Sequence, residues 1–375
     1  MPTTTMDVLF FPFLVFLLLL IVSSVPSECN PKPVIFNFGD SNSDTGNFLI
    51  TRGMLSQLPQ NFSLPLQGRL CDGRLVLDFL CESLNARYLS PFMESIASNF
   101  TNGVNFAIAG SSAFPRTGPF SLAVQVAQFA RFKNRSLEFF SPGIEGLLGE
   151  EDFANGLYVI DMGQNDLDTA FASHSYAQVV QRIPSWIAEI ENAIWNLYFL
   201  GARKFWVHST GPLGCLPLIL SRRNYSAGDL DRHGCSRAVN RAAKEFNDQL
   251  SRLCRQARRR MKGVKAVVYV DVFAIKYDLI ANSSKYGFKE DPMRVCCGYG
   301  GGRYNFNSTS QCGSKEFQVC DRVSQYVNWD GIHYTEAANK FVAAKILSTL
   351  YSTPRLAIAD VFLPQIPSTE SELVS

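Results

Sequence analysis

The chain has 375 residues, of which 46% are hydrophobic and 18% are charged, and its formal net charge is +2 at pH 7. A chain of this length and composition can bury a large core, so a globular protein is expected. The nearly neutral charge offers no electrostatic reason to expect a nucleic acid as a partner.

The N-terminal segment, residues 1–27, is predicted to be a signal peptide. Residues 8–22 form an unbroken apolar run, VLFFPFLVFLLLLIV, and the small or helix-breaking residues SSVPS follow it. This run has the length of a signal-peptide core and is short for a membrane span. The segment before it carries Asp7 and no Lys or Arg, which leaves an uncleaved membrane anchor as the alternative. We expect a secreted protein with no membrane span after cleavage.

Short apolar runs alternate with longer amphipathic stretches through the rest of the chain. Strands are predicted at residues 33–38, 104–108, 157–160, 204–208 and 266–270, and helices at 175–200, 236–261 and 335–351. Continuous apolar runs are typical of strands buried on both faces, and intervening helices provide parallel crossovers. The predicted fold is a three-layer α/β/α sandwich with a mostly parallel five-stranded sheet. We expect one domain over residues 28–353 and a loose tail over 354–375.

The cysteines indicate an oxidising compartment. The chain has ten, and four of them lie close together at Cys296, Cys297, Cys312 and Cys320. The sequence has no C-x-x-C pair and only four histidines, so disulfides are favoured over a zinc site. Cys215 and Cys235 flank one loop and are candidates for another bridge. The pairing within the cluster stays open at this point.

Glycosylation sequons also agree with secretion. The pattern Asn-x-Ser/Thr occurs at Asn61, Asn99, Asn134, Asn224, Asn282 and Asn307. This number of acceptor sites in a secretory protein favours a glycosylated surface.

A serine follows the first predicted strand at its carboxyl end, where ligands bind in open α/β sheets. The strand runs into FGDSNSDTGN, whose Gly, Asp and Ser residues favour a tight turn that displays Ser41. The alternative is an ordinary strand-to-helix turn in which Ser41 caps the helix. No G-x-S-x-G surrounds Ser41, so the sequence does not match the nucleophile elbow of α/β-hydrolases.

One of the four histidines has a carboxylate at a suitable spacing. His333 and Asp330 are three residues apart in NWDGIHYT, just before the last predicted helix, so both can point the same way. A carboxylate beside an imidazole fixes its tautomer, and the imidazole can then take a proton from a serine hydroxyl. His208 lies in an apolar strand pattern and is predicted to be a hydrogen-bonded core residue. The alternative for Asp330 and His333 is an incidental pair near a helix start.

Two further loops contain possible donors to an oxyanion. Asn165 lies in GQND directly after the third strand, and its side-chain amide can donate to developing negative charge. Gly110 ends the segment NFAIAG and can offer a backbone N–H. Taken alone, each loop is equally well an ordinary turn.

Together these four blocks resemble the SGNH hydrolase superfamily, and the plant GDSL esterase/lipase family in particular. FGDSNSDTGN is similar to the nucleophile block, NFAIAG to the oxyanion-glycine block, GQND to the G-x-N-D block and WDGIHYTEAAN to the D-x-x-H block. The blocks have the family's order and approximate spacing, and GPLGCLP and CCGYGGGRYNFN are secondary marks of the same family. The resemblance covers residues 33–351.

This resemblance implies a catalytic assignment and a fold. Ser41 would be the nucleophile, His333 the base and then the acid, and Asp330 its orienting partner. The oxyanion hole would comprise the backbone N–H groups of Ser41 and Gly110 and the side-chain amide of Asn165. The implied fold is a flavodoxin-like sandwich, and the implied reaction is two-step acyl transfer with no metal and no cofactor. An extracellular location in the cell wall or apoplast and a monomeric state are further expectations.

The sequence departs from the family pattern at two places. Asn42 stands where the family name has Leu, a position to which no chemistry is assigned. Residues 54–66, MLSQLPQNFSLPL, form a short and divergent segment near the nucleophile in the family fold. The second departure bears on the shape of the substrate pocket.

The favoured function is therefore a secreted serine esterase that acts on a lipid, an acetylated cell-wall carbohydrate or a small-metabolite ester. The alternative is a catalytically silent secreted protein that binds a carbohydrate or lipid on the same fold. A basic stretch near the end of the second long helix, from Arg252 to Lys262, is interpreted as a solvated helix end, with surface binding as the alternative.

Overall fold

The computed structural model describes residues 32–54, 68–115, 120–141, 146–298, 302–308, 312–313 and 317–363. One compact unit extends from Pro33 to Phe362. The predicted signal peptide and residues 55–66 of the divergent segment lie outside the described residues. Over the described ranges, every helix is too short or too polar to cross a lipid bilayer.

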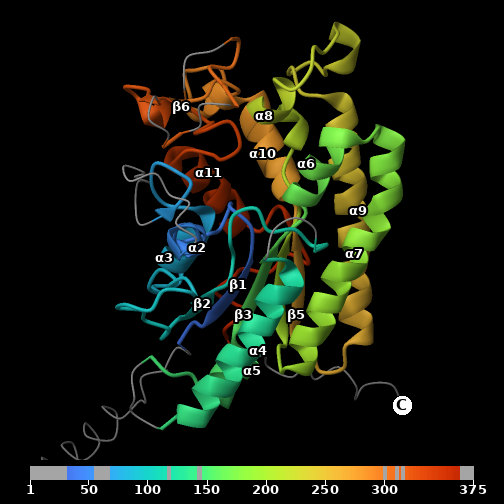
Figure 1. Cartoon of the computed structure of the whole chain (residues 1–375). Helices are drawn as coiled ribbons and strands as arrows, with labels where there is room; N and C mark the ends of the chain where they lie inside the picture. Colours follow the sequence, from blue (N-terminus) through green and yellow to red (C-terminus); the bar gives the residue numbers. More distant parts are fainter. Residues whose placement is uncertain are drawn as a thin grey trace, which may run out of the picture. The chain divides into compact units, whose positions relative to one another are not determined.

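The centre of this unit is a sheet of six strands in the order β2-β1-β3-β4-β5-β8 (Figure 1). The strands are β1 (Ile35–Gly39), β2 (Gly103–Asn105), β3 (Leu157–Asp161), β4 (Lys204–His208), β5 (Ala266–Val270) and β8 (Ser352–Thr353). All neighbouring pairs are parallel except β5 and β8, which are antiparallel. The predicted α/β fold with a mostly parallel sheet is confirmed, and the sheet has one strand beyond the five predicted, the two-residue antiparallel edge strand β8.

Helices cover both faces of the sheet (Figure 1). They are α2 (Asn47–Met54), α3 (Val76–Ser83), α4 (Leu122–Phe139), α5 (Glu150–Asn155), α6 (Gln164–Ser173), α7 (Tyr176–Phe199), α8 (Pro217–Leu220), α9 (Arg237–Arg260), α10 (Val272–Ala281) and α11 (Glu336–Leu347). On one side α7 packs against α4 and α9, and on the other α11 packs against α3 and α10. The predicted helices 175–200 and 236–261 match α7 and α9 to within one residue at each end.

The core is rich in aromatic rings where β1 meets its covering helices. Phe36 lies 5.1 Å from Phe129 of α4 and 5.3 Å from Phe153 of α5, measured between ring centroids. Every residue of β1 is buried, as expected for a strand that is covered on both faces. This packing fixes the strand whose carboxyl end leads into Ser41.

The last predicted helix ends earlier than expected. Helix α11 stops at Leu347, and Thr349 then adopts a left-handed φ of +62°, which turns the chain into β8. Beyond β8, Ile358, Val361 and Phe362 are buried in the core, so packed structure continues through the first part of the segment expected to be a loose tail. Residues 364–375 lie outside the described part of the chain.

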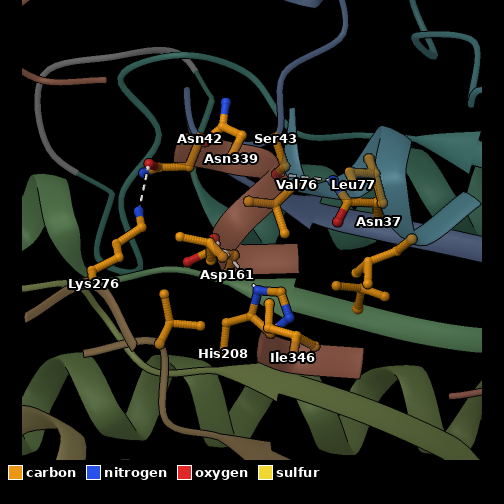
Figure 2. A pocket seen from close by; sticks show the side chains of 14 residues that line it. Asn37, Asn42, Ser43, Val76, Leu77, Asp161, His208, Lys276, Asn339 and Ile346 are labelled. Atoms are coloured by element: carbon orange, nitrogen blue, oxygen red, sulfur yellow. Dashed lines mark hydrogen bonds and ion pairs between the residues drawn. The ribbon is translucent and has the colours of Figure 1, made fainter. Parts of the chain in front are cut away.

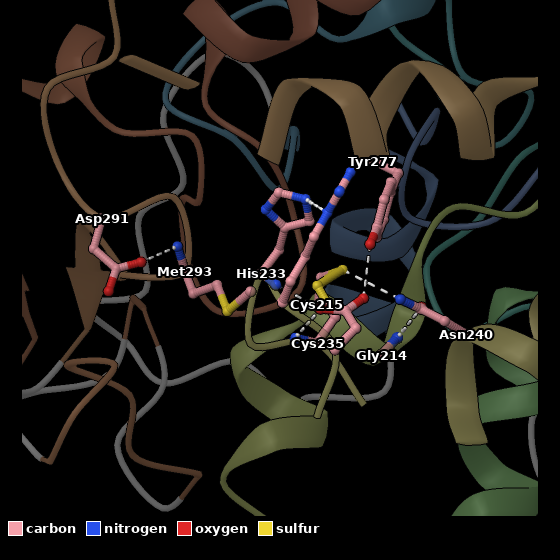
Figure 3. Close-up of a disulfide and its surroundings, with 10 residues drawn as sticks. Gly214, Cys215, His233, Cys235, Asn240, Tyr277, Asp291 and Met293 are labelled. Carbon is pink, nitrogen blue, oxygen red and sulfur yellow. Dashed lines mark hydrogen bonds between the residues drawn. A yellow bond between two sulfur atoms is a disulfide. The ribbon is translucent and has the colours of Figure 1, made fainter. Parts of the chain in front are cut away.

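Three disulfides join the cysteines for which bridges were predicted. The cluster forms Cys296–Cys320 and Cys297–Cys312, which settles the pairing that the sequence left open. The third bridge, Cys215–Cys235, ties the loop after β4 to the segment before α9 (Figure 3). Beside it, Asn240 of α9 accepts from the Gly214 N–H at 2.8 Å. Three further cysteines, Cys71, Cys81 and Cys254, are buried as free thiols.

Candidate active site

The residues predicted for the site come together around one cavity of about 270 Å³. It lies at the carboxyl edge of the sheet, where loops after β1, β2 and β3 meet the turn before α11. Its wall is formed by Ser41, Phe48, Arg52, Leu70, Ala109, Gly110, Asn165, Leu218, Phe306, Cys312, Asp330, Ile332 and His333. All five candidate catalytic and oxyanion residues are in this set.

Ser41 is not the cap of a helix. Helix α2 begins only at Asn47, and the carboxylate of Asp44 accepts the N–H groups of its first turn from Gly46, Asn47 and Phe48 at 2.7–3.0 Å. The same carboxylate accepts the Ala109 N–H at 2.8 Å, which links the loop that carries Ser41 to the loop that carries Gly110. The capping alternative for Ser41 is therefore wrong, because Asp44 fills that role.

The loop that carries Ser41 is held by side chains from α4 and β2. Gln125 of α4 accepts the Gly39 N–H at 2.9 Å and donates to the Gly39 carbonyl at 2.8 Å. Asn105 of β2 donates to the Ser43 carbonyl at 2.6 Å. These contacts satisfy backbone groups of the loop in a water-poor environment, so the backbone around Ser41 is fixed before any substrate binds.

Asp330 and His333 form a short hydrogen bond. Nδ1 of His333 lies 2.6 Å from Oδ2 of Asp330, and Oδ1 accepts the backbone N–H groups of Ile332 and His333 at 2.9 and 2.8 Å. Burial alone would raise the pKa of the Asp330 carboxyl, but the charge of His333 and these hydrogen bonds lower it. The carboxylate therefore stays ionised beside the imidazole. The Nε2 atom of His333 is buried and has no hydrogen-bond partner among the described residues.

Gly331 is needed for the turn that brings this pair together. Its φ is +99°, and an added Cβ would lie 2.3 Å from the ring of Phe306. A side chain at this position would be strained by the backbone and would collide with a residue of the cavity wall.

Gly110 and Asn165, the oxyanion candidates other than Ser41, both line the cavity. Gly110 has a φ of +83°, and an added Cβ would meet no atom within 4 Å, so its surroundings are open. Asn165 is in the first turn of α6, and its Nδ2 donates to the Ser111 carbonyl at 2.8 Å and to Oδ2 of Asp40 at 3.3 Å. The longer bond is the weaker of the two, so an approaching oxyanion competes with it more easily.

Asp40 adds a buried carboxyl directly before Ser41. Burial, and then repulsion from Asp161, raise its pKa to about 7, against hydrogen bonds from Asn42 and the charge of His333. Asp40 has no role in the catalytic assignment predicted from the sequence. A run of Gly, Asp and Ser after a strand indicates a turn and does not tell which carboxylate becomes enclosed.

His208 is buried on β4 as predicted, but the described residues include no hydrogen-bond partner for its ring. Its Nδ1 lies 3.7 Å from Oδ2 of Asp161, which is too long for a hydrogen bond, and its Nε2 has no partner in the described part of the chain. A metal-binding group of His, Cys, Asp or Glu side chains is likewise not found over the described ranges.

The family of the chain follows from sequence comparison. A model of the GDSL-like lipase/acylhydrolase family matches residues 35–346, which include all four blocks. The chain belongs to this family. It is 52% identical to the GDSL esterase/lipase At1g09390 of Arabidopsis thaliana over 338 residues, covering 88% of this chain and 90% of that protein.

Two other relatives from Arabidopsis thaliana have similar coverage. GDSL esterase/lipase LIP-4 is 49% identical, with 92% of this chain and 94% of that protein covered. A protein named Alpha-L-fucosidase 3 is 42% identical, with 84% and 90% covered. The predicted resemblance to plant GDSL esterases is thus confirmed, and the chain is a hydrolase that acts on ester bonds.

Proposed function

We propose that this member of the GDSL-like family is a secreted serine carboxylic-ester hydrolase that uses Ser41, His333 and Asp330 as its triad. The observation that carries the proposal is the 2.6 Å bond between His333 and Asp330 in the wall of a cavity that Ser41 also lines. A histidine held in this way has one nitrogen committed to the carboxylate and the other available to a hydroxyl.

The reaction follows from these positions. Nε2 of His333 accepts the proton of the Ser41 hydroxyl as its oxygen attacks the ester carbonyl. Asp330 stabilises the resulting imidazolium, which then protonates the departing alcohol and leaves an acyl group on Ser41. Water, deprotonated by the same histidine, attacks the acyl-enzyme, and the imidazolium then gives its proton to the oxygen of Ser41 as the acid leaves. His333 therefore carries every proton that these two steps transfer.

The N–H groups of Ser41 and Gly110 and the amide of Asn165 would stabilise the oxyanion in both steps. Asn165→Ala is expected to lower kcat by about 10²–10³-fold, because one preorganised donor is lost in a low-dielectric site. KM for a small ester should change little, since the donor acts on charge that develops in the transition state. Steady-state kinetics with p-nitrophenyl acetate measure both. An unchanged kcat would remove Asn165 from the oxyanion hole.

A short acyl group fits the cavity best. Its apolar wall contains Leu70, Leu218, Phe306 and Ile332, and its volume of about 270 Å³ is at the small end of ligand pockets. Of the ester classes expected from the sequence, acetylated carbohydrates and small-metabolite esters match this size better than long-chain lipids do.

Glycoside hydrolysis, which the name of one relative suggests, is a weaker candidate for this chain. That reaction generally uses a pair of carboxyl groups that flank the scissile bond. Among the described residues of the cavity wall, Asp330 alone carries a carboxyl group, and that group is hydrogen-bonded to His333. This composition supports ester hydrolysis.

Secretion is part of the proposal. Three disulfides and the predicted signal peptide suit an oxidising compartment. Among the sequon asparagines, Asn134, Asn224 and Asn282 are exposed and accessible to a glycan, while Asn61 lies outside the described residues.

The function is tested by labelling and by a series of p-nitrophenyl esters. We expect the secreted protein to react with a serine-directed fluorophosphonate and to hydrolyse the acetate at least about tenfold faster than a long-chain ester. A mass spectrum of the labelled peptide should place the adduct on Ser41. A folded protein that is neither labelled nor active would instead support the silent binding protein. Faster turnover of the long-chain ester would contradict the short-acyl proposal alone.

A further inference from the structure

A lysine is buried beneath the loop that carries the nucleophile. Lys276 of α10 is only 9% exposed, and its Nζ donates to Oδ1 of Asn42 at 3.3 Å (Figure 2). Its stem passes Gly211, where an added Cβ would lie 3.1 Å from Cδ of the lysine. A lysine is rarely buried to this extent unless its ammonium has partners, because taking the charge out of water is costly.

The surroundings of the ammonium supply those partners. Asp40 and Asp161 both attract it, although burial lowers its pKa overall. Nζ also lies 4.7 Å from the centroid of the Tyr334 ring, a cation–π distance, and Tyr334 directly follows the triad histidine. The ammonium thus contacts both chain segments that carry the triad.

Asn42 also forms hydrogen bonds with residues next to the proposed catalytic groups. Its Nδ2 donates to Oδ1 of Asp40 at 2.9 Å and to Oε1 of Gln164 at 3.3 Å. Asp40 in turn accepts from Asn165 at its other oxygen, at 3.3 Å. A continuous set of hydrogen bonds therefore leads from Lys276 to the residues on both sides of Ser41 and to Asn165.

Position 42 is also where this chain departs from the residue in the family's name. Leucine has no acceptor, so the bond to Lys276 exists only because Asn stands there. Removing the Asn42 acceptor leaves the buried ammonium of Lys276 without this partner, which is the expensive case for a buried hydrogen bond. Removing Lys276 leaves the half-buried amide of Asn42 without this donor.

We propose that Lys276 is a positioning residue for catalysis, which through Asn42 fixes the loop that presents Ser41 and the oxyanion donors. This inference rests on the proposed function of Ser41. Lys276 is not in the wall of the catalytic cavity and so makes no contact with substrate there. Its loss should therefore affect the chemical steps and leave substrate binding almost unchanged.

A double-mutant cycle on the secreted full chain tests the proposal. Lys276→Met keeps the apolar stem and removes the ammonium, and Asn42→Leu removes the acceptor. Each is expected to lower kcat for p-nitrophenyl acetate about tenfold with KM nearly constant, and the double variant should be no slower than the slower single variant. Lys285→Met, at an exposed lysine just beyond α10, serves as the control and should match the wild type.

Several results would overturn the inference. The first is a wild-type kcat in Lys276→Met. The second is a rise in KM as large as the fall in kcat. The third is a double variant whose loss of kcat equals the product of the two single losses. If Lys276→Met is not secreted, Asn42→Leu at the half-buried end of the pair carries the test, and a wild-type kcat there overturns the proposal.

Ser41→Ala separates the two proposals. If Ser41→Ala matches the wild type, the proposed function fails and the positioning role with it, whereas Ser41-dependent activity with an unaffected Lys276→Met removes the positioning role alone.

Discussion

Ser41→Ala is expected to lower kcat for p-nitrophenyl acetate by at least about 10⁴-fold. In the proposed mechanism this hydroxyl forms the acyl-enzyme, and no other serine is in the described wall of the cavity. The variant should fold as the wild type does, because Ser41 makes no hydrogen bond through its side chain that supports the loop among the described contacts, whereas Asp44 and Asn105 do. The remaining rate should be the rate enhancement over water that the oxyanion donors and substrate binding provide without a nucleophile.

The matched control is Ser43→Ala in the same loop. Ser43 accepts from Asn37 at 3.0 Å and lies outside the wall of the catalytic cavity, so its loss removes one supporting hydrogen bond. We expect a cost below about tenfold in kcat, in line with about 1 kcal/mol for such a bond. Steady-state kinetics of both variants, with circular dichroism to verify folding, distinguish loss of the nucleophile at Ser41 from loss of a supporting hydrogen bond at Ser43. Similar losses in the two variants would mean that Ser41 acts only through the loop.

Most of the sheet was predictable because its main strands are short, largely apolar runs buried on both faces, although the strand predicted at 104–108 is observed at Gly103–Asn105. Lys204–His208 and Ala266–Val270 match their predicted strands residue for residue. Strand β8 was missed for the opposite reason, since a pair of residues has no periodicity and is defined only by its partner on β5. Burial of Ile358 and Phe362 was missed because the prolines at 354, 364 and 367 and the polar end of the chain indicated a loose tail, although residues 355–363 are largely apolar.

The candidate catalytic residues could be named from the sequence because each block is local, and the structure brings them to one cavity. The residues that hold them in place could not, because their contacts cross long stretches of sequence: Gly39 to Gln125 over 86 residues and Asn42 to Lys276 over 234. A faint signal existed in Gln125, a polar residue on the helix face that also carries Leu122, Val126 and Phe129. A polar residue inside an apolar stripe indicates a buried polar partner but does not identify it.

Asp330→Asn is expected to lower kcat by about 10³–10⁴-fold while leaving KM close to the wild-type value. An asparagine amide in place of Oδ2 would donate to Nδ1 of His333, which places the ring proton on Nε2. That tautomer cannot accept the proton of Ser41, although the geometry of the pair is nearly unchanged. Kinetics with p-nitrophenyl acetate, together with the rate of fluorophosphonate labelling, measure this loss on the acylation step itself.

Asp291→Asn is the control for this variant, since Asp291 is exposed and its carboxylate accepts only a local N–H, that of Met293 at 2.9 Å, among the described contacts. Asp291→Asn should be as active as the wild type, because the Asp291 carboxylate is exposed and water can take over its one local hydrogen bond. The decisive comparison is the labelling rate. If Asp330→Asn is labelled within about tenfold of the wild-type rate, His333 does not depend on the carboxylate for its tautomer. The 2.6 Å bond would then be structural, and the base for Ser41 would have to be oriented by another group.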